Sequence, residues 1–171
     1  MSIRFKAENP AGEALRAWLE RLDKNHGDRA SIRRCRDAGA VAFQPAFVRF
    51  FISDLRPLFG PQAGAMRLAG IFGLASHLDG NKPCVLGTGD SMARQMASSR
   101  PGQSGGPRIS ELRFRRLLQY ERDDLYRPML RIIRALHGEA NVYDLADAVY
   151  YWGDNVRKRW AFDYFPYSEN R

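Results

Sequence analysis

Residues 124–137 read DLYRPMLRIIRALH, and this stretch decides the fold class of the chain. Its apolar residues recur every three or four positions, a spacing that places them on one face of an α-helix. They are Leu125, Met129, Ile132, Ile133 and Leu136. On the opposite face, Arg127, Arg131 and Arg134 repeat at i, i+4 and i+7. The stretch therefore predicts an amphipathic helix with a buried apolar face and a basic stripe, ended by Gly138.

Helical spacing continues outward from this stretch in both directions. Towards the N-terminus, helices are expected at 11–24, at 29–37 with Asp28 as N-cap, at 45–59, and from Pro61 to Ala75. A further short helix is expected to end at Met96, with Thr88 or Asp90 as its N-cap. Towards the C-terminus, they are expected at 109–120, at 141–152 with Asn141 and Asp144 as a capping box, and at 154–163. Pro128 either lies in the first turn of its helix or kinks it. No strand pattern is present, so the fold class is predicted to be all-α, with about eight or nine helices.

Residues 98–107 (SSRPGQSGGP) interrupt this helical pattern. They hold three Gly, two Pro and three Ser, a composition typical of a mobile loop. We therefore expect an N-terminal helical lobe at 1–97, a flexible loop at 98–107 and a C-terminal helical lobe at 108–171. A single compact domain is the alternative that the sequence leaves open.

The charge of the chain indicates a polyanionic partner. Its 171 residues include 27 basic and 19 acidic side chains, for a formal net charge of +8. Of the basic residues, 23 are Arg and 4 are Lys. Arginine can hold phosphate oxygens in a bidentate fork, which lysine cannot. A GC-rich genome would explain the ratio of Arg to Lys, but it would not explain the net charge.

Several other classes of protein are disfavoured. No apolar run approaches the roughly 18 residues of a membrane span. The first ten residues have no hydrophobic stretch, so we expect no secretory signal and a cytoplasmic location. Cys35 and Cys84 are too few for a disulfide scaffold and lack metal-binding spacing.

Candidate catalytic groups are scattered and match no known pattern. The three histidines, His26, His77 and His137, are far apart in the sequence. The stretch 87–91 (GTGDS) lacks both the Lys-Ser/Thr pair and the preceding strand of a phosphate-binding loop. Three carboxylates could in principle hold Mg²⁺, although acids near a helix start need no metal to explain them. They are Asp144, Asp147 and Asp154. We therefore expect no enzymatic activity, no cofactor and no metal.

Basic residues instead gather in three places. Arg29, Arg33 and Arg36 fall at i, i+4 and i+7, with Arg34 beside them. Residues 108–134 carry eight Arg against four acids, and they include Arg113 and Arg116 one turn apart as well as the stripe described first. The third place is Arg157-Lys158-Arg159, bracketed by Trp152 and Trp160. Like charges at helical spacing repel unless an anion neutralises them. A solvated helix face is the alternative for the first two clusters, and core packing of the aromatic residues is the alternative for the third.

Landmarks along nearly the whole chain resemble the CasB family, the small subunit of the type I-E CRISPR surveillance complex called Cascade. In chain order they are Leu15–Trp18 with Leu22, Arg29–Arg34, Phe72–Ala75, Ser110–Glu111 with Arg113 and Arg116–Leu118, Asp124–Leu125 with Leu130–Arg131, and Tyr151–Gly153 followed by a basic helix ending at Asp163–Phe165. No single landmark is very specific, whereas their order and spacing together are.

The resemblance implies a two-lobed helical bundle without a catalytic site. It implies single- and double-stranded DNA and guide RNA as partners, together with the backbone and large subunits of Cascade and a second copy of the chain. It also implies a role in antiviral defence, in which the subunit helps to hold the displaced DNA strand. By position, Arg94, Arg113, Arg122 and Arg131 match the family's basic groove, and Arg33-Arg34 match its N-terminal basic helix. Asp154-Asn155 depart from relatives that are basic after the Trp-Gly pair.

Combining the resemblance with the basic clusters gives one set of candidate nucleic-acid-binding residues. They are Arg33, Arg34, Arg94, Arg113, Arg116, Arg122, Arg127, Arg131, Arg134, Arg157 and Lys158. Two other functions stay open from the sequence. A helix-turn-helix regulator would need a second helix at residues 39–43, where none is expected. A purely structural adaptor would use the positive charge to meet an acidic protein.

Overall fold

The apolar spacing of the sequence folds into helices, as expected. The structure, a computed structural model, describes residues 3–61, 64–100, 102 and 105–169. Its elements are α1 (Pro10–Lys24), α2 (His26–Arg33), α3 (Ala38–Ala42), α4 (Pro45–Phe50), η1 (Phe51–Leu55), α5 (Arg56–Phe59), α6 (Ala65–Ala75), α7 (Pro83–Leu86), α8 (Met92–Ala97), α9 (Glu111–Leu117), η2 (Arg122–Asp124), α10 (Tyr126–Ala135), α11 (Val142–Tyr150) and α12 (Asp154–Ser168). The described residues contain no strand, which confirms the all-α prediction. With the uninterrupted run 45–59 taken as one, eight helices of the described chain have seven or more residues, close to the expected eight or nine.

The first two helices meet at Asn25, which ends one and begins the other. Its backbone N–H donates to the carbonyl of Arg21 at 3.1 Å, and its side chain accepts from the N–H of Asp28 at 3.0 Å. The predicted cap at Asp28 is therefore wrong, because one Asn can close a helix with its backbone and cap the next with its side chain. The predicted helix also ends early, at Arg33, and α3 occupies the segment where no helix was expected.

Two other predicted helix starts are corrected. Pro61 lies in a turn, and α6 begins at Ala65. Helix α8 is capped by Ser91, whose hydroxyl accepts from the N–H of Arg94 at 3.3 Å, and not by Thr88 or Asp90. Near Ser91 three residues suited to an N-cap stand close together, and propensity alone does not choose among them.

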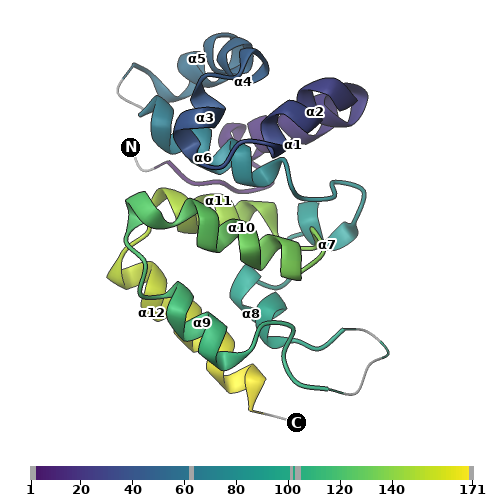
Figure 1. Cartoon of the computed structure of the whole chain (residues 1–171), viewed down its shortest axis with the longest axis vertical. Coiled ribbons are helices and arrows are strands. Elements are labelled where there is room, and N and C mark those ends of the chain that lie inside the picture. The colour runs from purple at the N-terminus through teal and green to yellow at the C-terminus, as the bar shows by residue number, and fades with distance from the viewer. Residues whose placement is uncertain (1–2, 62–63, 101, 103–104, 170–171) are drawn as a thin grey trace.

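Helix α6 occupies the centre of the molecule. It packs against α1 and α3 on one side and against α10 and α11 on the other, between the upper and lower helices of Figure 1. Trp18 of α1 is fully buried and donates its indole N–H to the carbonyl of Phe72 at 2.9 Å. A Cβ at Gly73 would stand 2.7 Å from Val41 and 2.8 Å from the Tyr126 hydroxyl. The close approach of α3 and α10 to α6 therefore requires this glycine.

The loop at 98–107 is closed at its base by two backbone hydrogen bonds. Arg108 N–H donates to the Ser98 carbonyl and Ile109 N–H to the Met96 carbonyl, both at 3.0 Å. Residues 101, 103 and 104, at the centre of the expected mobile loop, lie outside the described residues. Helix α8, before this loop in the chain, packs against α12, the last helix of the chain segment after the loop. The boundaries 1–97 and 108–171 stay a prediction.

Candidate nucleic-acid interface

Helix α10 carries the basic stripe on which the sequence analysis began. Its apolar residues are buried, whereas Arg127, Arg131 and Arg134 are exposed, as their spacing predicted. Pro128 is the third residue of the helix, so it lies in the first turn, where a missing N–H costs no helical hydrogen bond. His137 and Gly138, with φ of 56° and 73°, adopt the left-handed conformation that ends the helix.

The arginines of α2 and its C-terminal extension lie beside this stripe. The Arg127 guanidinium donates to the carbonyl of Arg36 at 3.4 Å. At the other end, Arg29, Arg33 and Arg134 line the same depression. Two stripes about a hundred residues apart in sequence are thereby joined. We call the joined surface the α2–α10 basic surface, and it consists of Arg29, Arg33, Arg36, Arg127, Arg131 and Arg134.

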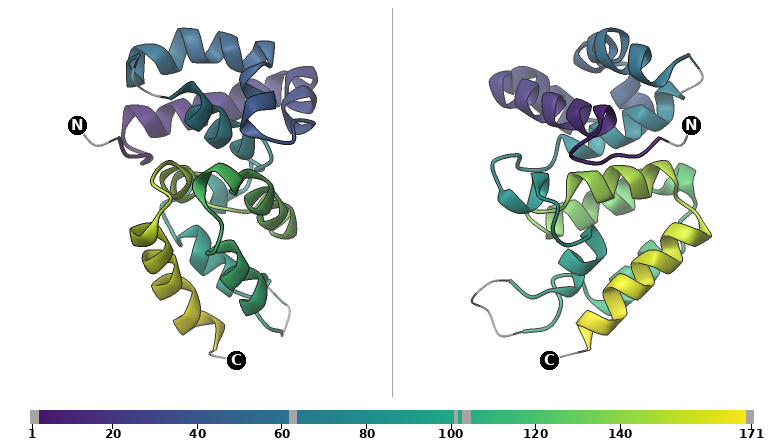
Figure 2. Two further views of the ribbon diagram at one scale, coloured as in Figure 1. Left: turned by 60° about the vertical axis from the view of Figure 1, so that its left-hand side comes forward. Right: turned by 180° about the vertical axis from the view of Figure 1, so that it is seen from behind.

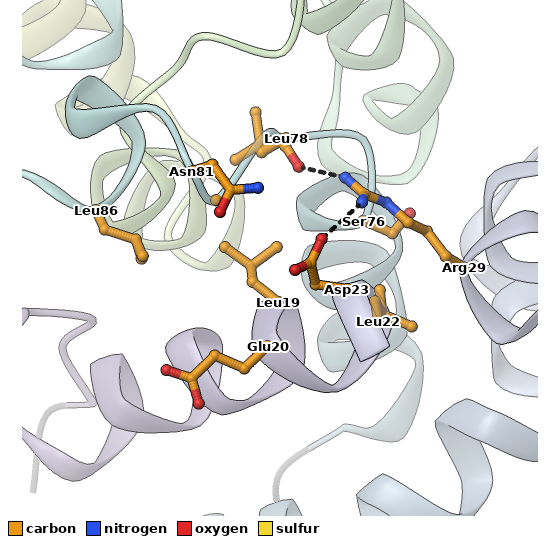
Figure 3. Close-up of a pocket in the computed structure, with 10 residues that line it drawn as sticks. Leu19, Glu20, Leu22, Asp23, Arg29, Ser76, Leu78, Asn81 and Leu86 are labelled. Carbon is orange, nitrogen blue, oxygen red and sulfur yellow. Dashed lines mark hydrogen bonds and ion pairs between the residues drawn. The ribbon is translucent and has the colours of Figure 1, made fainter. Parts of the chain in front are cut away.

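Few acids neutralise this surface. Arg29 forms an ion pair with Asp23 at 3.5 Å and donates to the Leu78 carbonyl at 3.3 Å, as Figure 3 shows. Arg33 donates through Nε to the Ser76 carbonyl at 2.7 Å. Burial lowers the pKa of Arg33, and the neighbouring charge of Arg29 lowers it further. Within the described part of the chain, the other five arginines of the surface form no ion pair.

Helix α9 adds two further exposed arginines. Ser110 caps the helix, as its hydroxyl accepts from the N–H of Arg113 at 3.4 Å. Arg113 and Arg116 are exposed and form no ion pair with a described residue, whereas Arg115 between them pairs with Glu111 at 2.8 Å. The views of Figures 1 and 2 place α9 on the same side of the lower helices as α10, with α12 behind it. Helix α9 therefore adds two exposed arginines without an ion pair among the described residues.

Other candidate residues have partners inside the protein. Arg94 lies 3.7 Å from the Asp90 carboxylate and 4.4 Å from the centre of the Tyr167 ring. Arg122 donates to the Trp152 carbonyl at 2.9 Å, beyond the C-terminus of α11. Arg34 is exposed, donates to the Ser31 hydroxyl at 3.4 Å, and lines one depression with Arg36 of the α2–α10 basic surface. Arg94 and Arg122 are not members of that surface.

The basic and aromatic segment of α12 is mainly structural. Arg157 donates to the Tyr120 carbonyl at 2.7 Å and pairs with Glu121 at 3.3 Å and with Asp154 at 3.4 Å. Trp152 and Trp160 are buried against each other, so the core-packing alternative for these aromatic rings is correct. Lys158 is exposed.

The acids and histidines considered for catalysis are also placed. Asp144 accepts from Met92 N–H at 2.9 Å and from Arg159 at 2.6 Å, which leaves the expected capping box only half formed. Asp147 accepts from Phe5 N–H at 2.8 Å. In the part of the chain that the structure describes, no three His, Cys, Asp or Glu side chains gather as metal ligands would. Likewise, none of its helices is both long and apolar enough to span a bilayer.

Sequence reasoning missed His77, which lines the same depression as His137, Arg33 and Arg134. Burial, together with the charges of Arg33, Arg134 and Arg29, lowers the pKa of His77 to about 4. Its Nε2 is buried and forms no hydrogen bond with a described residue. Sixty residues separate the two histidines, and no local pattern in the sequence could have brought them together.

Comparison with known proteins places the chain among CRISPR-associated proteins. Residues 28–165 match the family model of CRISPR-associated protein Cse2. Among solved structures, a chain of Escherichia coli Cascade bound to a PAM-containing double-stranded DNA target is similar, with a TM-score of 0.67 and 20% identity over 94% of this chain and 97% of that one. CasB from Thermus thermophilus gives 0.65 and 23%, over 91% and 97%. A search of curated protein sequences found no match. The family match covers most of the chain and the two structures share its fold, so this protein belongs to the CRISPR-associated Cse2 family.

Proposed function

We propose that this protein is a non-catalytic small subunit of a Cascade-type CRISPR complex, and that it holds nucleic acid backbone without sequence preference. The observation that carries the proposal is the joining of two arginine stripes into the α2–α10 basic surface, where five of six arginines have no acidic partner among the described residues. Mutual repulsion on such a surface is relieved when phosphates bind.

The surface suits a protein that must accept any target sequence. Phosphate contacts position a nucleic acid, whereas sequence is read at the base edges. Formation of an R-loop exchanges DNA pairing for guide pairing at nearly balanced free energy, so modest backbone contacts can shift it. We infer that the bound strands are the displaced DNA strand and the duplex of guide RNA and target, and that the role is antiviral defence in the cytoplasm.

Such a subunit also needs protein partners. The large apolar side chains of Phe43, at the end of α3, and of Ile52, in η1, are 86% and 57% exposed. Large apolar side chains left exposed can mark protein contacts. We therefore propose that the backbone and large subunits of the complex, and a second copy of this chain, pack outside the basic surface.

The test is the salt dependence of binding to single-stranded DNA. We expect log affinity to fall with log salt by about 0.7 per neutralised phosphate, equally for unrelated sequences. The double variant Arg127→Ala/Arg131→Ala should lower both affinity and slope. Arg56→Ala, which removes an exposed arginine of α5, is the matched control and should leave both unchanged. A flat salt response of the wild type would refute nucleic-acid binding and leave only the protein adaptor.

The proposed lack of catalysis needs its own assay. We expect no cleavage of single- or double-stranded DNA or of RNA in the presence of Mg²⁺. Two of the acids considered as Mg²⁺ ligands, Asp144 and Asp147, already accept hydrogen bonds from backbone N–H groups and from arginine side chains. Turnover that disappears in the Asp144→Asn variant, with folding retained, would contradict this part of the proposal.

A further inference from the structure

The depression between α2 and the end of α10 is a concave part of the basic surface. It has a volume of about 500 Å³ and is lined by Arg29, Arg33, His77, Asp79, Arg134, His137 and Gly138. These residues come from three segments, namely α2, the turn after α6 and the C-terminal end of α10. Its lining contains no Phe, Tyr or Trp ring on which a base could stack.

The backbone around Gly138 brings these segments together. Asp79 N–H donates to the Gly138 carbonyl at 3.1 Å, which ties the turn after α6 to the end of α10. A Cβ at Gly138 would stand 2.9 Å from the His77 carbonyl oxygen, and the residue has φ of 73°. Only glycine accommodates both the positive φ and the close approach to the His77 carbonyl at low cost. Gly138 therefore lets the end of α10, which carries Arg134, pack against the turn that carries His77.

Two of the three arginines at the depression are available to a ligand. Arg29 is engaged by Asp23 and the Leu78 carbonyl on the side shown in Figure 3. Arg33 uses only Nε, towards the Ser76 carbonyl, so its two terminal nitrogens have no partner among the described residues. The guanidinium of Arg134 likewise forms no hydrogen bond or ion pair with a described residue. Asp79 is the one carboxylate in the lining, and it accepts from Asn81 N–H at 3.0 Å.

His77 lines the same depression. Its Nε2 is buried without a hydrogen-bond partner among the described residues, although a buried polar atom of this kind normally has one. The groups that face it are Arg29 and Arg33 from α2, Arg134 and His137 from the end of α10, and Asp79 from its own turn. Positive groups outnumber negative ones, so an anion would be stabilised here.

We propose that this depression is the subsite for one backbone phosphate of the bound strand, held by the free nitrogens of Arg33 and Arg134. This inference rests on the proposed function and adds to it the place where one phosphate of the strand is bound. The rest of the α2–α10 basic surface contacts the backbone at exposed side chains, whereas here a phosphate is held between two segments that are distant in sequence. Arg29 keeps the wall of the subsite in place.

The first experiment measures binding of a fluorescent oligothymidylate of about 15 nucleotides at several salt concentrations. Arg134→Ala should weaken binding about 3- to 10-fold and reduce the salt slope by about 0.7, the value for one phosphate. Arg134→Lys keeps the charge without the fork and should recover the slope but only part of the affinity. Arg56→Ala is again the control. Arg134 forms no hydrogen bond or ion pair with a described residue, so these variants should melt like the wild type.

The second experiment follows the His77 imidazole by NMR as the pH is changed. In the free protein its pKa is about 4, because burial and three arginines oppose its protonation. A bound phosphate offsets those charges, so the pKa should rise towards the ordinary value near 6.5 when the oligothymidylate is present, and less so in Arg134→Ala. Inorganic phosphate should give a smaller rise of the same sign if the subsite binds phosphate by itself.

The outcomes separate the two proposals. An unchanged His77 pKa and an unchanged slope in Arg134→Ala, with binding lost in Arg127→Ala/Arg131→Ala, would refute the subsite and leave the proposed function in place. Absence of salt-dependent binding in the wild type would refute both. A rise of the His77 pKa with inorganic phosphate alone, without any effect of Arg134→Ala on the oligothymidylate, would also refute a role in strand binding.

Discussion

Helices α10 and α12 have similar basic content in the sequence, yet their cations differ in the folded protein. The arginines of α10 project from an amphipathic helix and form no ion pair among the described residues. On α12, Arg157 and Arg159 are each paired with carboxylates, and the aromatic rings beside them are buried. The comparison teaches that a basic cluster indicates a binding surface when internal carboxylates leave most of its cations unpaired.

The largest change in the free energy of unfolding is expected at Trp160, and it tests whether the aromatic rings of α12 are structural. If α12 used its aromatic rings to stack bases, Trp160→Ala would weaken DNA binding and leave stability unchanged. We expect instead a loss of about 3–5 kcal/mol in the free energy of unfolding, because the side chain is fully buried. Chemical denaturation measures it. Phe162→Ala, in the same helix and 78% exposed, should change stability by less than about 0.5 kcal/mol.

A smaller effect is expected at Arg157. Arg157→Ala removes hydrogen bonds to the Tyr120 carbonyl and to two carboxylates, and it should lower the free energy of unfolding by about 1–2 kcal/mol. The neighbouring variant Lys158→Ala removes the same charge at an exposed position and should change it very little. If the two variants unfold alike while Arg157→Ala alone loses DNA affinity, the structural role of Arg157 is disproved.

The low pKa of His77, which lies near the arginines at the end of α10, should make the stability of the protein depend on pH. His77 has a pKa of about 4 in the folded protein and near 6.5 when unfolded, so the unfolded state binds more protons between these values. Stability should therefore fall as the pH drops from 6.5 towards 4, by no more than about 1.4 kcal/mol per pH unit. Denaturation of wild type and His77→Gln across this range measures it. Equal pH dependence in both proteins would show that the pKa of His77 is not lowered in the folded protein.

The smallest effect on stability is expected at Arg131. Arg131→Ala should change the free energy of unfolding by less than about 0.5 kcal/mol, because the side chain is exposed and has no ion-pair partner among the described residues. Its effect should appear in binding, as a salt slope reduced by about 0.7. Melting curves and salt titrations of the same preparation measure both. A marked loss of stability without a change in slope would place Arg131 with the structural arginines of α12.

The helices and their buried faces could largely be predicted from the sequence, since periodicity records which residues face the core. Prediction failed at Pro61, and at boundaries such as Asn25 and Ser91, where several residues of similar propensity compete. The arginine stripes of α2 and α10 were also predictable, because each is local to one helix or its extension. Their union was not, because it depends on how α2 and α10 pack around α6.

By itself, the sequence determined an all-helical chain with excess positive charge, and its landmarks indicated the CasB family, a resemblance that the comparisons confirm. Only the tertiary structure decided which arginines are free. Whether Arg157 or Arg131 meets a carbonyl or a carboxylate depends on residues tens of positions away, such as Tyr120 and Glu121. The structure alone also placed His77 beside Arg33 and Arg134. Charge is a property of each residue, whereas its neutralisation is a property of the packed chain.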